Sequence, residues 1–152
     1  MTTIYRIQHA GVLKQMLELD YEHIIDDSCP AFKDYNVDAT NPDKYFLAAI
    51  DKEKHRQVCL IMLYKQNHVL AECHINVFPD YRKTDLTTYI NAAKEWVRTN
   101  TTIQGVITLI PKSREYIHKF CLKYGWKEKC IIKRAFQKDH ILEDCILLEL
   151  EL

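Results

Sequence analysis

Several features that mark other protein classes are missing from this chain of 152 residues. Lys plus Arg and Asp plus Glu both total 21, so no net charge attracts nucleic acid or an anionic membrane over a distance. No apolar run approaches the roughly 18 residues that a membrane span needs. Residues 1–6 also lack the basic start and apolar core of a signal peptide. We therefore expect a soluble intracellular protein without a membrane or nucleic-acid partner.

Cysteine pairs with metal-binding spacing are absent as well. None of the six cysteines forms a Cys-x-x-Cys pair, and most lie in apolar stretches, which favours reduced, buried thiols over a disulfide framework. Cys73 and His74 are adjacent on a predicted strand, so their side chains would point to opposite faces and would not share a zinc ion. We expect no metal site. No Gly-x-Ser-x-Gly elbow accompanies Ser113, and no local nucleophile signature surrounds Cys121.

The chain does contain a regular succession of strand and helix patterns. Its length and its 47% hydrophobic content suffice for one core, and no repeat or linker divides it, so we expect a single α+β domain over residues 1–152. Strands are predicted at 3–8, 45–50, 57–65, 69–78, 105–110, 126–137 and 140–152. Helices are predicted at 12–24, 84–99 and from 113 to the glycine at 125. Residues 26–41 are predicted to form a functional loop or a short second helix.

The ends of these elements carry further expectations. Thr84 or Asp85 is expected to cap the helix at 84–99, and Ser113 the late helix, which Gly125 would close in the left-handed conformation. The continuously apolar strand at 105–110 is predicted in the centre of the sheet. The tail at 146–152 is predicted to be either a well-paired last strand or an edge strand. In the second case it would pair with a protein partner or with a second copy of the chain.

Two junctions point to a known family. Residues 77–83, Val-Phe-Pro-Asp-Tyr-Arg-Lys, lead from a strand into a helix, and residues 120–126, Phe-Cys-Leu-Lys-Tyr-Gly-Trp, leave one. Together with the order of elements they resemble the Gcn5-related N-acetyltransferase (GNAT) family over nearly the whole chain. The resemblance implies a three-layer α/β/α fold, with a mixed, mostly antiparallel sheet of about seven strands flanked by helices.

The family resemblance also implies a coenzyme site at the first junction. There the family typically has Val-x-Pro-Glu-Tyr-Arg-Gly-x-Gly-x-Gly or Ala, and backbone N–H groups at the helix start hold the coenzyme A pyrophosphate. The glycine positions hold Lys83, Asp85 and Thr87 in this chain. Asp85 would bring a carboxylate beside the pyrophosphate, which Arg82 and Lys83 would partly offset. The coenzyme-binding residues implied by the resemblance are Val77, Arg82, Lys83, Thr84 and Thr87.

The late helix departs from the family as well. Many members have an Asn near its start for the pantetheine arm, and a Tyr four residues before its closing Gly as general acid for the departing thiolate. This chain has Ser113 or Arg114 at the first position and Cys121 at the second. Tyr116, about one turn earlier on a similar face, is the candidate substitute for the general acid.

A candidate general base lies on the predicted strand at 69–78. Glu72, His74 and Asn76 alternate there and therefore share one face of the strand. A carboxylate and an imidazole on one face can take a proton from an attacking amine, directly or through water. The predicted catalytic residues are thus Glu72, His74 and Tyr116. The alternative is a polar sheet face exposed to solvent or to a partner.

Two functions follow from these observations. The altered turn predicts a GNAT-like domain with a degenerate acetyl-CoA site, which needs no cofactor and serves as a non-catalytic assembly or binding module. A bacteriophage virion or head-assembly component is one example, since small GNAT-like phage proteins have similar loops; such a protein would reside in a host cytoplasm or in the virion. The alternative is an active acyl-CoA-dependent N-acetyltransferase that binds acetyl-CoA at residues 82–87 and uses Glu72 or His74 as general base.

Overall fold

The computed structural model describes residues 2–152, with the backbone alone for His23. Within this range seven strands form one sheet in the order β1-β2-β3-β4-β5-β7-β6. The strands are β1 (Thr2–Arg6), β2 (Lys44–Asp51), β3 (Arg56–Lys65), β4 (Leu70–Val77), β5 (Gly105–Pro111), β6 (Lys127–Lys138) and β7 (Ile141–Glu151). Only β4 and β5 pair in parallel among these neighbours; the other pairs are antiparallel. The predicted mixed, mostly antiparallel sheet is confirmed.

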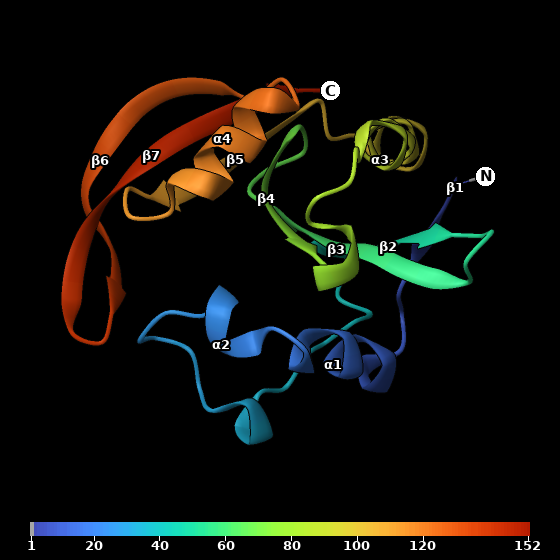
Figure 1. Cartoon of the computed structure of the whole chain (residues 1–152), viewed down its shortest axis with the longest axis horizontal. Coiled ribbons are helices and arrows are strands. Elements are labelled where there is room, and N and C mark those ends of the chain that lie inside the picture. The colour runs from blue at the N-terminus through green and yellow to red at the C-terminus, as the bar shows by residue number, and fades with distance from the viewer. Residues whose placement is uncertain (1) are drawn as a thin grey trace.

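Helices cover both faces of the sheet, which gives the predicted three layers (Figure 1). On one face lie α1 (Ala10–Glu18) and α2 (Tyr21–Ile24), and on the other lie α3 (Thr87–Asn100) and α4 (Glu115–Lys123). Each face has its own apolar cluster. Leu13, Met16 and Leu17 of α1 belong to the first, and Ile90, Ala93 and Val97 of α3 belong to the second. Their spacing of three and four residues explains why these segments are helical and which side they bury.

Two of the predicted helices differ in the structure. The helical pattern at 12–24 is divided between α1 and α2. The stretch at 26–41, predicted as a functional loop or a short second helix, is a loop with one 3-10 turn, η1 (Phe32–Asp34). α3 begins at Thr87, with Leu86 in the N-cap position, so the predicted helix start is three residues too early. The Asp85 carboxylate nevertheless accepts the first amide of the helix, that of Thr87, at 3.1 Å. A second 3-10 turn, η2 (Pro79–Tyr81), delays the helix, because the Thr84 hydroxyl binds the Tyr81 carbonyl and closes that turn.

The start of α4 was also predicted wrongly, whereas its end was predicted well. Arg114, not Ser113, is the N-cap, and Ser113 instead donates its amide and hydroxyl to the Glu143 carboxylate at 3.0 and 2.9 Å. Gly125 follows the helix with a φ of 91°, the left-handed conformation expected there.

The last strand is an internal strand of the sheet. β7 pairs with β5 on one side and with β6 on the other, so its edge alternative is wrong. The hairpin of β6 and β7 folds so that β6, which comes first in the chain, becomes the outer strand. β5 lies inside the sheet, between β4 and β7, as its apolar sequence predicted. All six cysteines are free, and Cys59, Cys73, Cys121 and Cys145 are buried. Within residues 2–152, no helix combines the length and apolar character needed to cross a membrane.

Candidate functional site

The two parallel strands diverge after a short paired segment. β4 and β5 pair only through Leu70 with Gly105, Ala71 with Val106 and Glu72 with Ile107. Residues 73–77 of β4 keep their pairing with β3 but have no register partner in β5. A cavity of about 370 Å³ opens at this divergence and is lined by residues of β4, β5, α1, α2, α4 and β6. The far part of β4 therefore offers an open backbone edge to whatever enters the cavity.

The polar face predicted on β4 lines this cavity. Glu72, His74 and Asn76 all belong to its wall, and the His74 Nε2 and Glu72 Oε1 atoms are 3.0 Å apart. The antiparallel register places Tyr64 of β3 opposite Glu72, and the centroid of the Tyr64 ring is 5.6 Å from that of His74. The prediction that these three side chains share a face is confirmed, and the face borders a cavity.

Glu72 and His74 form a half-buried pair. Their side chains are 33% and 42% exposed, respectively. The hydrogen bond from His74 holds the pKa of the Glu72 carboxyl below its ordinary value. Glu72 is consequently an anion at neutral pH and a weak proton acceptor, suited to orienting the imidazole. When Nε2 carries the proton that Glu72 accepts, Nδ1 is left as an acceptor.

Asn76 is a buried amide with an unused donor. The residue is 5% exposed, and its Nδ2 atom makes no hydrogen bond within the described chain. A buried amide N–H without a partner costs free energy, so such groups mark positions where a ligand or water completes the structure. Because Asn76 lines the cavity, its free N–H fits a ligand carbonyl there.

The opposite wall includes α4. Cys121 lines the cavity at the position implied for a general acid, and burial raises the pKa of its thiol to about 11. The thiol stays protonated at neutral pH and is a weak acid. The other candidate, Tyr116, is 71% exposed and does not line this cavity. The structure thus does not bring Tyr116 together with Glu72 and His74.

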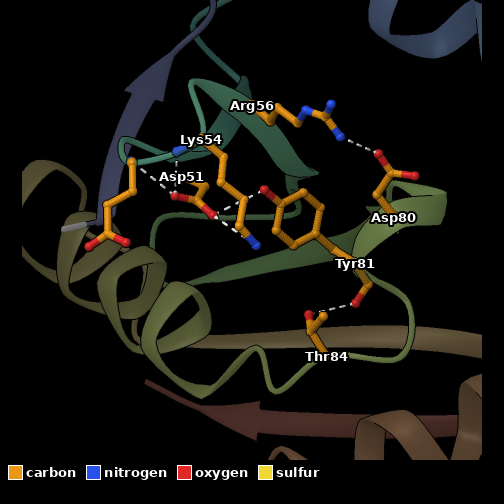
Figure 2. A network of polar contacts seen from close by, with 7 residues as sticks. Asp51, Lys54, Arg56, Asp80, Tyr81 and Thr84 are labelled. Carbon is orange, nitrogen blue, oxygen red and sulfur yellow. Dashed lines mark hydrogen bonds and ion pairs between the residues drawn. The ribbon is translucent and has the colours of Figure 1, made fainter.

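The turn after β4 is anchored to the β2–β3 hairpin (Figure 2). The Tyr81 hydroxyl donates to Asp51 at 3.1 Å, and Arg56 pairs with Asp80 at 2.9 Å. The Tyr81 side chain is buried, and burial together with the bond to Asp51 raises the pKa of its phenol, so it remains a donor. The Thr84 hydroxyl closes the turn on the Tyr81 carbonyl at 2.9 Å. Three side-chain contacts therefore anchor the turn at this end of β4.

Several of the predicted coenzyme-binding residues bind other groups of this chain. Arg82 donates its Nε to the Val77 carbonyl at 3.0 Å and pairs with Asp20. Thr87 donates its amide and its hydroxyl to the Asp85 carboxylate at 3.1 and 2.7 Å. These bonds hold the pKa of Asp85 below its ordinary value. Lys83 is exposed to solvent.

Tyr124 is a site residue that the sequence did not predict. Its hydroxyl accepts the Leu86 N–H at 2.9 Å and lies 3.4 Å from an oxygen of Asp85. The amides of Leu86 and Thr87, which begin α3, are thus occupied by side chains of this chain. The one signal for this role was the position of Tyr124 directly before Gly125, at the end of the late helix.

A second contact joins segments far apart in sequence at the rim of the cavity. Asp27, in the loop after α2, accepts the amides of Asp139 and His140 at 2.8 Å each, with one carboxylate oxygen for each amide. Its own amide donates to the Gln137 carbonyl at 3.0 Å. The cavity lining includes the neighbouring residues Asp26 and Phe136. The loop and the β6–β7 hairpin together form this rim.

Comparisons with known proteins identify the fold. No family model matches the chain, and no curated protein matches it. Among solved structures, spermidine N-acetyltransferase from Vibrio cholerae in complex with CoA and spermine is 16% identical, with a TM-score of 0.79 over 99% of this chain and 95% of that one. The V. cholerae spermidine/spermine N-acetyltransferase in complex with manganese ions is 15% identical, with a TM-score of 0.75 over 99% and 92%. At these identities the likeness establishes the arrangement of the chain.

Proposed function

From the GNAT fold that this chain adopts, we propose that it is an acyl-CoA-dependent N-acetyltransferase. The observation that carries the proposal is the cavity at the divergence of β4 and β5, with the Glu72–His74 pair on its wall. Fold alone does not fix an activity, so the proposal depends on these residues.

The pantetheine arm of the acyl donor fits the open edge of β4. A pantetheine arm is extended and carries two amides, so it can pair with residues 73–77 as an added strand does. The free N–H of Asn76 supplies a further donor for a carbonyl of the arm. The cavity volume of about 370 Å³ lies within the ordinary range for small-molecule sites, about 300–1,000 Å³. V. cholerae spermidine N-acetyltransferase binds CoA on the same fold, which supports this donor class.

The chemistry is the attack of an amine on a thioester. The amine nitrogen bonds to the carbonyl carbon, the carbon–sulfur bond breaks, and the sulfur leaves as a thiolate. His74 Nδ1 accepts the amine proton, while Glu72 holds the opposite nitrogen at 3.0 Å and stabilises the imidazolium. Cys121, with a pKa of about 11, is a poor proton source. We propose that a water molecule gives a proton to the thiolate and takes one from the His74 imidazolium, which returns His74 to the neutral form.

A second candidate, the non-catalytic assembly or binding module, has one observation in its favour. The amides that begin α3 donate to Asp85 and Tyr124, which leaves fewer free N–H donors at the helix start for a pyrophosphate. The two V. cholerae structures are both of enzymes, and the comparisons add no support for a phage or virion role. A subunit contact made by strand pairing would use β1 or β6, because these are the outer strands of the sheet.

Binding and turnover assays test the proposal. Acetyl-CoA and S-acetylpantetheine are each added to the protein, and its Tm is measured together with thiol release in the presence of a panel of amines. We expect stabilisation by at least one thioester, and amine-dependent thiol release that His74→Ala abolishes. The exposed residue His68 provides the matched control, His68→Ala. If neither donor at millimolar concentration raises the Tm or releases thiol, the enzyme proposal is wrong and the binding module gains support.

A further inference from the structure

We propose that this chain recognises its donor through the pantetheine thioester and gains little affinity from the diphosphate, because Asp85 and Tyr124 occupy the diphosphate's position at the start of α3. The proposal depends on the proposed function and sharpens its substrate class. The donors are acyl thioesters on a pantetheine arm, whether or not a nucleotide follows. Asp85 is then the residue that determines this specificity.

The first step is the bond between Asp85 and Thr87. The Thr87 amide is the first N–H of α3, the kind of unpaired donor that binds an anion at a helix start. Here it points at a carboxylate of the same chain, and the Thr87 hydroxyl binds the same oxygen. The chain thus supplies its own anion to this helix end, and a second anion would be repelled by it.

The second step is the position of Tyr124. Its hydroxyl accepts a hydrogen bond from the amide before that of Thr87, the Leu86 N–H, and lies 3.4 Å from an oxygen of the Asp85 carboxylate. The ring is fixed by Phe120, with 4.8 Å between the two ring centroids, and the helix closes at Gly125 directly after it. A diphosphate would have to displace a phenol held by α4 as well as a carboxylate.

The third step concerns the cations of the turn. In this chain the Arg82 guanidinium binds the Val77 carbonyl and the Asp20 carboxylate. The Thr84 hydroxyl, a neutral donor of the same turn, binds the Tyr81 carbonyl. Lys83 is the other cation of the turn, and it is exposed. The groups that would offset Asp85 are therefore mostly committed to holding the turn.

The thioester end of the site remains open. Residues 73–77 of β4 have no register partner in β5, and the Asn76 amide has a free donor at the cavity. The groups that would bind a pantetheine arm are thus available, whereas the α3 amides that would bind a diphosphate are already hydrogen-bonded. We therefore expect the arm, and not the nucleotide, to provide most of the binding affinity.

The test compares donors with and without the nucleotide diphosphate. Acetyl-CoA and S-acetylpantetheine are compared by kcat/KM, and coenzyme A and pantetheine by calorimetric Kd. In the wild type we expect the two members of each pair to agree within about threefold. In Asp85→Gly we expect acetyl-CoA and coenzyme A to gain about tenfold or more, with S-acetylpantetheine and pantetheine unchanged. Tyr124→Phe, which frees the Leu86 amide and keeps the ring, should shift the ratio in the same direction.

Asp80→Asn is the matched control, because it removes a carboxylate of the same turn that pairs with Arg56 of β3 and not with an amide of α3. It should leave the donor ratio unchanged. A wild-type preference for acetyl-CoA above about tenfold, or an equal gain of both donors in Asp85→Gly, overturns the inference while leaving the proposed function intact. Absence of binding and turnover with every donor refutes the proposed function instead. If Asp85→Gly does not fold, Asp85→Asn and Tyr124→Phe give the same comparison.

Discussion

The hydroxyl of Tyr124 accepts the amide of Leu86 at 2.9 Å across 38 residues of sequence. Leu86 is the N-cap of α3 and Tyr124 is the C-cap of α4, so this bond joins the start of one helix to the end of the other. Helix ends carry unpaired amides that need partners, and here a phenol supplies one. The relationship therefore affects stability as well as the donor site.

Replacement of Tyr124 by Phe should destabilise the protein by about 1 kcal/mol, the usual net value of one hydrogen bond. For a chain of this size that corresponds to a fall in Tm of about 2–4 °C. Calorimetry measures the Tm, and hydrogen exchange should show faster exchange of the Leu86 amide. Tyr116→Phe, on the exposed side of the same helix, is the control and should leave both unchanged. Equal effects of the two variants would contradict this role of Tyr124.

Replacement of Asn76 by Leu should stabilise the unliganded protein and weaken donor binding. The change removes a buried N–H that has no partner, so we expect a gain of up to about 1 kcal/mol in the free energy of unfolding. The increase of Tm by S-acetylpantetheine should shrink in the same variant. Asn91→Leu, on the exposed side of α3, is the control for a change from amide to leucine. A variant that is less stable and responds fully to the ligand would argue against an unfilled donor at this position.

Replacement of His74 by Ala should raise the pKa of Glu72 toward the ordinary carboxyl value, because the hydrogen bond that lowers it is lost. A lowered pKa in the folded state stabilises the protein above the ordinary carboxyl pKa, and this contribution disappears as the pH falls through the lowered value. The variant should therefore lose stability at neutral pH but not in acid. Carbon-13 NMR of the Glu72 carboxyl measures the pKa directly.

The same variant tests catalysis. We expect kcat to fall by about a hundredfold or more with little change in the donor KM, as for loss of a general base. Tyr116→Phe should have no effect on either constant, since Tyr116 is exposed and away from the cavity. A large loss in Tyr116→Phe would restore the sequence-based assignment of Tyr116 as general acid.

Replacement of Tyr81 by Phe should loosen the turn after β4. The hydroxyl donates to Asp51, which also accepts backbone amides of the β2–β3 turn, so its loss leaves a buried carboxylate with one partner fewer. We expect a loss of about 1 kcal/mol and faster hydrogen exchange in residues 79–86. Tyr5→Phe, at a half-exposed tyrosine of β1, is the control. Unchanged exchange in residues 79–86 would show that the turn does not depend on this anchor.

Replacement of Asp27 by Ala should loosen the rim that the loop after α2 and the β6–β7 hairpin form, where we propose that the amine enters. Its carboxylate holds the two consecutive amides of Asp139 and His140, both of which have positive φ. Without it we expect faster exchange of those amides and a higher KM for the amine, with the donor KM unchanged. Asp34→Ala, an exposed acid of η1, controls for the loss of charge. A matching rise in the donor KM would mean that the effect is a general loss of structure.

Much of the site followed from local geometry. The alternation along β4 put Glu72, His74 and Asn76 on one face, because side chains of a strand alternate. The glycine-poor turn likewise predicted that Asp85 would stand near the helix start. The helix boundaries were less predictable, since the 3-10 turn at 79–81 and the bond of Ser113 to Glu143 compete with capping. The exposure of Tyr116 depends on how α4 packs, which its own sequence spacing did not fix.

The sequence by itself therefore determined the elements, the polar face of β4 and the absence of glycine in the turn, because periods of two and 3.6 residues and local backbone preferences act within a few residues. Only the tertiary structure decided that β4 and β5 separate after Glu72 and Ile107, that β7 lies inside the sheet, and that Tyr124 reaches Leu86. These features join segments 30 to 40 or more residues apart, where pairing and packing of the whole sheet, not local preference, set the outcome.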